Sequence, residues 1–334
     1  MTVRGFPLRR GAFISGAAAA MTAGSLRPVH AQAAPAVRMG CGPAAEEQLW
    51  LMAVRPDLCP NQGKSYTYSL TQFPAANMRI TAFEAGQLDA ASSSMVGLLF
   101  AASKGVDVRI VANLGAESRK YFSTSYFALT ESGITLNAQS LKGKTFGING
   151  YRQSLELWAR IAVQKLGLDP SRDVNWVIVP LPEMGNALRA KKIDVGVFPE
   201  AFAVEEQKKG GVKRLFTSAS VSGIEEEFDV YFSPKFIAAH PVAVRGWIAD
   251  FRNVTKYLQQ NERAARQALI DNGKWIKVPD PASYVATTQA NDLDRTYMKP
   301  KLATLEKLEG ELVKAGWIEK PMDVAKLVDN AFTA

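Results

Sequence analysis

The chain has 334 residues, of which 47% are hydrophobic, 22% charged and 9% aromatic, a balance typical of globular proteins. This composition argues against fibrous, disordered and polytopic membrane proteins. The length predicts two domains, or one large one, with enough chain to bury a sizeable core. The chain has two histidines and two cysteines, but His30 lies in a segment that we expect to be removed, which leaves three such side chains where a structural zinc site uses about four. We therefore expect neither a metal site nor a cofactor.

The first 33 residues have the features of an export signal. They contain four arginines and no acidic residue, and residues 13–21 are small and apolar. This run is shorter than the roughly 20 residues that span a bilayer, and it precedes small-x-small sites ending at Ala31 and Ala33. We expect residues 1–33 to be a signal peptide that is removed on export to the periplasm. The pair Arg9-Arg10 resembles a twin-arginine signal, and the export route stays open.

The charge of the remaining chain does not indicate a nucleic-acid partner. Four of the positive charges behind the formal net charge of +8 lie in the first 33 residues, which leaves +4. No stripe of lysine and arginine with interleaved aromatic residues follows. We expect no binding of nucleic acid.

Export would place Cys41 and Cys59 in an oxidising compartment, where a disulfide is chemically allowed. A helix over 44–55 would carry the chain roughly 18 Å away from Cys41. A disulfide requires Cα atoms within about 7 Å. The connection after Asp57 could turn back, so the pairing stays open at this stage.

Strand and helix patterns alternate along most of the chain. The first series has predicted strands at 37–41, 66–70, 87–91 and 108–112 and predicted helices at 44–54, 74–86 and 95–103. A second series has predicted strands at 122–130, 145–149, 174–179, 194–198 and 212–216 and predicted helices at 154–166, 183–192 and 199–209. Residues 228–232 are expected to cross back to the first series, and 241–334 to be wholly helical. This order indicates an α/β protein with a mainly parallel sheet covered on both faces.

Three junctions between a predicted strand and the next predicted helix carry polar residues, and ligands of open α/β sheets bind at such ends. Ser92-Ser93-Ser94 could hold an anion with the free N–H groups of a helix start, or could simply cap the helix. Arg152 could offer a bidentate fork to a carboxylate or sulfonate, or could be an exposed loop arginine. Glu200 could accept from a ligand donor, or merely favour the helix dipole.

The residues give no sign of catalysis. No cluster of His, Cys, Asp or Glu has metal-binding spacing, and no Gly-x-Ser-x-Gly elbow occurs. His240 precedes Pro241 and is most simply a helix-start residue. We predict that the protein is not an enzyme.

The order of three motifs resembles the taurine, nitrate and sulfonate family of periplasmic solute-binding proteins of ABC importers, which also includes binders of thiamine precursors. These motifs are Ala85-Gly86-Gln87-Leu88-Asp89, Leu141-Lys142-Gly143-Lys144-Thr145, and Ala187 to Val195 ahead of Pro199. The resemblance implies a two-lobed periplasmic binding protein fold of type II character, closing on its ligand, with a helical C-terminal region. We expect residues 34–115 and 230–334 to form lobe 1 and residues 116–229 to form lobe 2.

The resemblance also implies which positions line the cleft. The family's cleft positions correspond here to Cys41, Gly42, Pro43, Ser93, Ser94, Arg152, Gln153, Ser154 and the segment Pro199-Glu200-Ala201-Phe202. We expect Arg152 to neutralise an anionic group of the ligand. Apolar walls are expected from Phe73, Tyr151, Phe202 and Tyr231. Glu200 would suit a ligand that carries an amino, hydroxyl or ring N–H donor.

These features predict a monomeric periplasmic receptor that captures a small organic anion, a sulfonate, carboxylate or aromatic acid, and delivers it to an ABC permease in the inner membrane. Three alternatives stay open. The first is a binder of a pyrimidine or another heteroaromatic compound. The second is an enzyme related to the pyrimidine synthase that these binders resemble, although that enzyme uses a cysteine-rich motif that this chain lacks. The third is a sensory partner of a membrane kinase.

Overall fold

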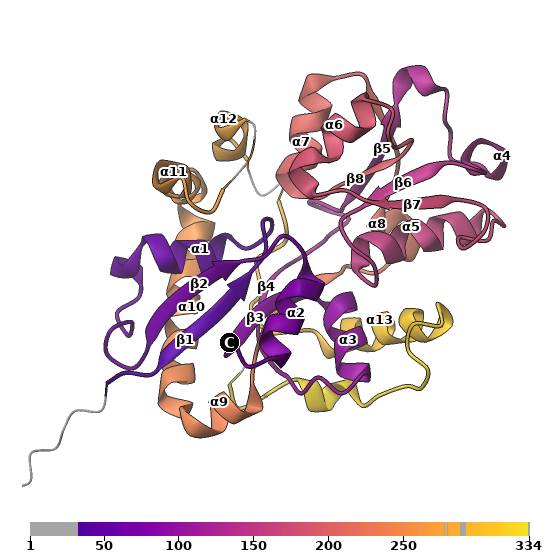
Figure 1. Ribbon diagram of the computed structural model, residues 1–334. Helices are drawn as coiled ribbons and strands as arrows, with labels where there is room; N and C mark the ends of the chain where they lie inside the picture. Colours follow the sequence, from indigo (N-terminus) through magenta and orange to yellow (C-terminus); the bar gives the residue numbers. More distant parts are fainter. Residues whose placement is uncertain (1–32, 277, 279, 288–291, 333–334) are drawn as a thin grey trace, which may run out of the picture. The chain divides into compact units, whose positions relative to one another are not determined.

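The computed structural model describes residues 33–276, 278, 280–287 and 292–332. The predicted signal peptide, except for Ala33, lies outside the described residues, so its cleavage and export route remain predictions. From Ala34 onward the chain is a single unit. It contains three β-sheets: the largest forms the first group of strands, and the other two form the second group (Figure 1).

The first sheet has five strands in the order β2-β1-β3-β10-β4. Its strands are β1 (Ala36–Cys41), β2 (Thr67–Gln72), β3 (Ala90–Ser94), β4 (Arg109–Ala116) and β10 (Glu227–Phe232). β1 runs parallel to β2 and β3, whereas β10 lies antiparallel between β3 and β4. The mainly parallel sheet and the returning segment at 228–232 are thus confirmed. Ser92 to Ser94 belong to β3 itself, so the strand extends three residues beyond its predicted end.

Helices cover both faces of this sheet. One face carries α1 (Glu47–Val54), α9 (Pro234–Ala239), α10 (Pro241–Gln260) and α11 (Glu262–Asn272), and the other carries α2 (Ala76–Glu84), α3 (Met95–Ser103) and α13 (Leu302–Lys314). Successive strand residues point to opposite faces. Ala90 accordingly packs in one hydrophobic cluster and Ala91 in the other, and Val230 and Tyr231 divide in the same way.

The second group of strands forms a three-stranded antiparallel sheet, β8-β5-β9, and a parallel pair, β6-β7. Its strands are β5 (Ser125–Leu129), β6 (Thr145–Ile148), β7 (Asn175–Ile178), β8 (Gly196–Phe198) and β9 (Val212–Thr217). Its helices are α4 (Ala138–Leu141), α5 (Ser154–Lys165), α6 (Met184–Arg189), α7 (Glu200–Lys209) and α8 (Ser218–Ser222). The Gly147 N–H donates to the Val195 carbonyl at 2.8 Å, which links the two sheets.

The C-terminal region is mostly but not wholly helical. After α10 and α11 come α12 (Pro281–Val285), α13 and a 3-10 turn, Val324–Leu327. Between α12 and α13 the chain instead runs along β4, where Asp294 forms an antiparallel bridge with Ala116. Shorter 3-10 turns occur at Pro56–Leu58, Thr130–Ser132 and Leu181–Glu183. None of the helices within the described ranges has both the length and the apolar character that a membrane crossing needs.

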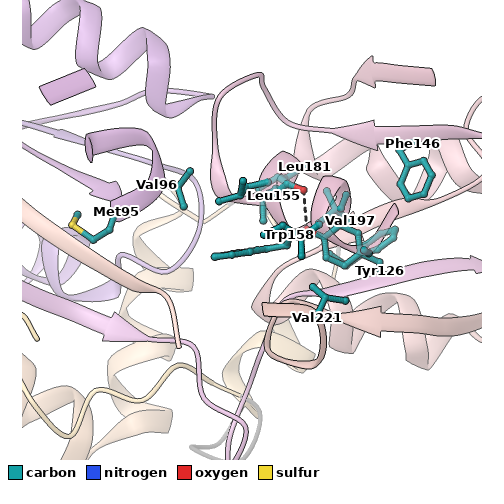
Figure 2. Packing of buried hydrophobic residues seen from close by; sticks show 14 of the residues in the cluster. Met95, Val96, Tyr126, Phe146, Leu155, Trp158, Leu181, Val197 and Val221 are labelled. Atoms are coloured by element: carbon teal, nitrogen blue, oxygen red, sulfur yellow. Dashed lines mark hydrogen bonds between the residues drawn. The ribbon is translucent and has the colours of Figure 1, made fainter. Parts of the chain in front are cut away.

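The hydrophobic core continues from α3 into the second group of strands. Figure 2 shows Val96 of α3 on the side of Leu155 and Trp158 of α5, with Met95 farther from them. All four side chains belong to one buried cluster, and Trp158 is fully buried. The start of α5 is therefore held next to the start of α3 by apolar packing.

We predict that Trp247→Ala lowers the free energy of unfolding by about 3–5 kcal/mol, the usual cost of removing a large buried aromatic side chain. Trp247 is fully buried, stacks on Phe251 and meets the edge of Phe232, with ring centroids 5.2 Å apart in both pairs. Urea denaturation measures the change. Val242→Ala on the same helix is the control, because Val242 is 64% exposed and its truncation should leave the unfolding free energy nearly unchanged.

Candidate ligand-binding site

A cavity of about 80 Å³ lies where the carboxyl ends of β1, β3 and β6 approach one another. Both groups of strands contribute to its wall. The lining residues are Gly42, Pro43, Ala44, Ala45, Glu46, Phe73, Pro74, Ala75, Ala76, Arg79, Ser94, Glu117, Phe122, Thr124, Asn149, Gln153, Ser154, Leu155, Leu181, Pro199, Phe228 and Leu293. The wall therefore combines three phenylalanines with amide, hydroxyl, carboxyl and guanidinium groups.

Five helices begin at this cavity: α1, α2, α3, α5 and α7. Their N-cap residues, Glu46, Ala75, Ser94, Gln153 and Pro199, all line it. Among these described N-caps, none makes a side-chain hydrogen bond to the first turn of its helix. Elsewhere in the described part of the chain, side chains cap α4, α8, α9 and α12, whereas α6, α10, α11 and α13 also begin without a side-chain cap, so what distinguishes these five helices is that they begin at one cavity. The first N–H groups of a helix lack intrahelical partners and carry partial positive charge. Their convergence favours a negatively charged ligand.

A buried ion pair, Arg79 with Glu46, forms one wall. The guanidinium Nη1 lies 3.2 Å from Glu46 Oε1, and both side chains are only 5% exposed. Glu46 Oε2 also accepts from the Gly42 N–H at 2.8 Å and from the Ser92 hydroxyl at 2.5 Å. Burial raises the pKa of Glu46, whereas Arg79 and the other donors oppose that rise. A side chain at position 42 would not fit, because an added Cβ would lie 2.9 Å from both charged groups.

Three buried polar atoms of the lining residues have no hydrogen-bond partner: Arg79 Nε, Gln153 Nε2 and Asn149 Oδ1. A buried donor or acceptor without a partner costs about 1–3 kcal/mol. A ligand that satisfied these atoms would recover that cost. Their grouping around one cavity marks the polar part of the candidate site.

Two buried carboxyl groups, Glu117 and Glu226, lie where the chain passes between the two groups of strands. Glu117 lines the cavity and accepts from the hydroxyls of Thr124, at 2.5 Å, and Ser218. Glu226 accepts from the Trp158 indole N–H at 3.0 Å. Burial raises the pKa of Glu117, and burial together with the charge of Glu117 raises the pKa of Glu226 to about 8. Both shifts make protonation easier than in an exposed carboxyl.

The cavity brings together seven of the predicted cleft and wall residues. These are Gly42, Pro43, Phe73, Ser94, Gln153, Ser154 and Pro199. Four other predicted residues are buried but are not part of its lining: Cys41, Ser93, Phe202 and Tyr231. Because side chains alternate along a strand, Cys41 at the end of β1 points into the core beneath α1. Cys41 and Cys59 are both buried free thiols, so the disulfide that the sequence left open is not formed.

Arg152, the predicted anion partner, does not line the cavity. Its residue has a φ of +60°, and its guanidinium lies over the rings of Trp317 and Phe100. Tyr151 is 46% exposed, and its hydroxyl donates to the Trp176 carbonyl at 3.4 Å. Glu200 is the first residue of α7, and its side chain lies outside the described part of the structure.

The guanidinium in the cavity instead belongs to Arg79, which the sequence reasoning missed, together with Glu46 and Glu117. Arg79 and Glu46 lie inside predicted helices, where charged residues usually face solvent. One signal was available: Arg79 shares a helix face with Phe83, at i and i+4, so the pattern placed a charge on an apolar face.

We predict that Arg79→Met lowers the free energy of unfolding by about 3–5 kcal/mol, because it leaves the Glu46 carboxylate buried without its partner. The double variant Glu46→Gln with Arg79→Met should recover part of the loss. Urea denaturation of both variants tests this. Arg38→Met is the matched control, since the Arg38–Asp89 pair is partly exposed and should contribute only about 0–1 kcal/mol. Equal losses for Arg79→Met and Arg38→Met would contradict the prediction.

We also predict a pH-dependent effect of Glu226→Gln. The carboxyl of Glu226 has a pKa raised from 4.5 to about 8 in the folded chain, so between these values the native state binds a proton that the unfolded state lacks. This group therefore makes the wild type less stable as pH rises through that window. The variant should gain stability over the wild type from pH 5 to pH 8, by up to about 1.4 kcal/mol per pH unit. Urea denaturation at several pH values measures the gain, and exposed Glu225→Gln should show none.

Solved structures share this fold along most of the chain. The alkanesulfonate-binding protein SsuA from Xanthomonas axonopodis pv. citri, bound to MOPS, aligns with a TM-score of 0.70 at 16% identity, covering 90% of this chain and 99% of that one. SsuA from Escherichia coli, an aliphatic sulphonate binding protein, gives 0.68 at 17% identity, with 88% and 92% covered. The nitrate-binding protein NrtA from Synechocystis PCC 6803 gives 0.71 at 12% identity, with 90% and 87% covered.

These likenesses confirm the expected fold class, a mixed α/β periplasmic binding protein fold. No curated protein matches the chain in sequence. A sequence model of the NMT1-like family, however, matches residues 30–272, well over half of the chain. The chain therefore belongs to the NMT1-like family.

Proposed function

We propose that this protein is the periplasmic solute-binding component of an ABC importer and that it captures a small organic anion in the cavity described above. The observation that carries the proposal is the convergence of five helix starts without side-chain caps on one cavity that also holds the Arg79 guanidinium. Helix N-termini and a guanidinium both favour negative charge. The sulfonate-binding and nitrate-binding proteins that share the fold are consistent with this ligand class.

The acidic residues of the wall do not oppose an anion. Glu46 is paired with Arg79, so these two charges largely cancel. Burial raises the pKa of Glu117, so this carboxyl takes up a proton beside an anion more readily than an exposed one, and the hydroxyls of Thr124 and Ser218 donate to it. The unpartnered donors Arg79 Nε and Gln153 Nε2 would supply further hydrogen bonds. Arg79 thus offers a guanidinium N–H donor to the ligand, whereas its charge is already balanced by Glu46.

The apolar part of the wall favours an organic ligand over a simple inorganic ion. Phe73, Phe122 and Phe228 contribute rings to the lining. Such rings can stack on a planar group. They also support the second candidate, a pyrimidine or another heteroaromatic ligand, for which the amides of Asn149 and Gln153 would provide both donors and acceptors.

The remaining features of the proposal follow from the solute-binding role. The two groups of strands would act as lobes with the boundaries predicted above, residues 34–115 with 230–334 and residues 116–229. The protein would reach the periplasm through the signal peptide, act as a monomer and deliver its ligand to an inner-membrane permease. It would bind and release its ligand without covalent chemistry, and the described lining contains neither histidine nor cysteine.

A thermal-shift screen of residues 34–334 tests the proposal. The compounds are MOPS, short alkanesulfonates, nitrate, aromatic carboxylates and pyrimidines. A ligand that binds only the native state at a hundredfold excess over Kd stabilises it by about 2.7 kcal/mol, which gives a clear shift. We expect stabilisation by organic anions. Mass spectrometry after denaturation checks for a ligand already bound on purification, and the absence of both any shift and any bound compound would contradict the proposal.

The Glu117→Gln variant separates the ligand classes. Gln is isosteric and cannot ionise, so an anion should still stabilise the variant at least as strongly as it stabilises the wild type. A ligand that places an amine or a protonated ring nitrogen against Glu117 should instead lose most of its stabilising effect. Exposed Glu183→Gln serves as the control and should bind like the wild type.

A further inference from the structure

The backbone at Arg152 is held in an unusual conformation just before α5. Its φ of +60° lies in the left-handed region, which residues other than glycine rarely adopt. The Arg152 N–H donates to Glu156 Oε2 at 2.6 Å, and the buried Glu156 also accepts from Arg160 at 2.6 Å. Strain of this kind persists only where the surroundings fix it. The backbone at Arg152 is thus fixed by the first turn of α5.

The guanidinium of Arg152 reaches two aromatic rings that belong to the other group of elements. Its Cζ lies 4.9 Å from the ring centroid of Trp317 and 5.9 Å from that of Phe100. Phe100 is part of α3, and Trp317 follows α13, which packs on α3. Trp317 is only 5% exposed. The cation–π contact therefore joins the start of α5 to helices that cover the five-stranded sheet.

This contact lies next to the candidate site in the sequence and in space. Gln153 and Ser154, the two residues after Arg152, line the cavity, and so does Ser94 at the start of α3. Ligand entry that separates α5 from α3 would have to break the contact between Arg152 and the two rings. Arg152 thus lies outside the cavity but connects α5 and α3, whose N-termini both line it.

We propose that Arg152 is a positioning residue that holds the start of α5 against α3 and so sets how tightly the cavity is closed. This inference rests on the proposed function, because such a contact matters only if the two lobes separate. Arg152 would therefore influence the retention of an anionic ligand without touching it. Trp317 is its main partner, since it is the nearer ring and is held almost fully buried.

The test measures the separation of the lobes without any ligand. Spin labels at Leu136→Cys and Val242→Cys report the distance, because these positions are 40% and 64% exposed, whereas native Cys41 and Cys59 are buried. Arg152→Asn removes the guanidinium while retaining a residue that tolerates positive φ. Trp317→Leu removes the ring, and Arg152→Lys keeps the charge. Arg172→Ala is the matched control, because its side chain is 81% exposed and pairs only with Asp169 in the same group.

We expect Arg152→Asn and Trp317→Leu each to raise the ratio of longer to shorter distances about two- to fivefold, the equilibrium effect of an exposed cation–π contact. The double variant should equal the single variants, and Arg152→Lys should be intermediate. Unchanged distances in Arg152→Asn with unchanged thermal unfolding would overturn the inference. The distance measurement needs no ligand, so the two proposals can fail separately. A ligand screen without any binding contradicts the proposed function. Unchanged distances together with a positive ligand screen contradict only the role of Arg152.

Discussion

The position of β10 in the first sheet is the constraint on which the candidate site depends. The chain leaves this sheet after β4 and returns through β10, which pairs antiparallel with both β3 and β4. Glu227 is therefore opposite Ala116, and the Glu117 N–H donates to the Glu226 carbonyl at 2.8 Å. The outgoing and returning segments are joined at this point. The start of α5, which lies in the segment between them, shares the cavity wall with Gly42 after β1 and Ser94 at the end of β3.

The electrostatics of the cavity follow from this arrangement. Helices that follow parallel strands begin at the same edge of the sheet. The direction of the strands therefore brings their first N–H groups together, whatever the side chains are. The wall adds one guanidinium, already balanced by Glu46, and a carboxyl whose pKa is raised by burial. Much of the positive potential would thus come from backbone groups, which cannot lose their charge with pH. Such a site can accept different anions through changes in its apolar lining.

Arg79 and Arg152 lie in different places, although the sequence pointed to Arg152 as the residue that meets the anion. Arg79 is buried against the cavity, beside Glu46, and is placed to meet a ligand. Arg152 lies outside the cavity, on Trp317 and Phe100. Membership of the NMT1-like family and the likeness to sulfonate-binding and nitrate-binding proteins do not distinguish these roles. Only the direction of each side chain does.

The sequence by itself determined the α/β class, the order of nearly all strands and helices, and the helix starts that surround the cavity, because periodicity and capping residues act locally. Ser94 and Ser154 lie at such strand-to-helix junctions, whereas Gly42 and Pro43 were expected only from the family resemblance; all four line the cavity. The tertiary structure alone decided that Arg79, Glu46 and Glu117 face the cavity, and that Cys41 and Tyr231 turn into the core. The extended segment at 293–301 was missed because its partner, β4, is far away in the sequence. Side-chain direction depends on contacts between distant segments, and no local pattern records those contacts.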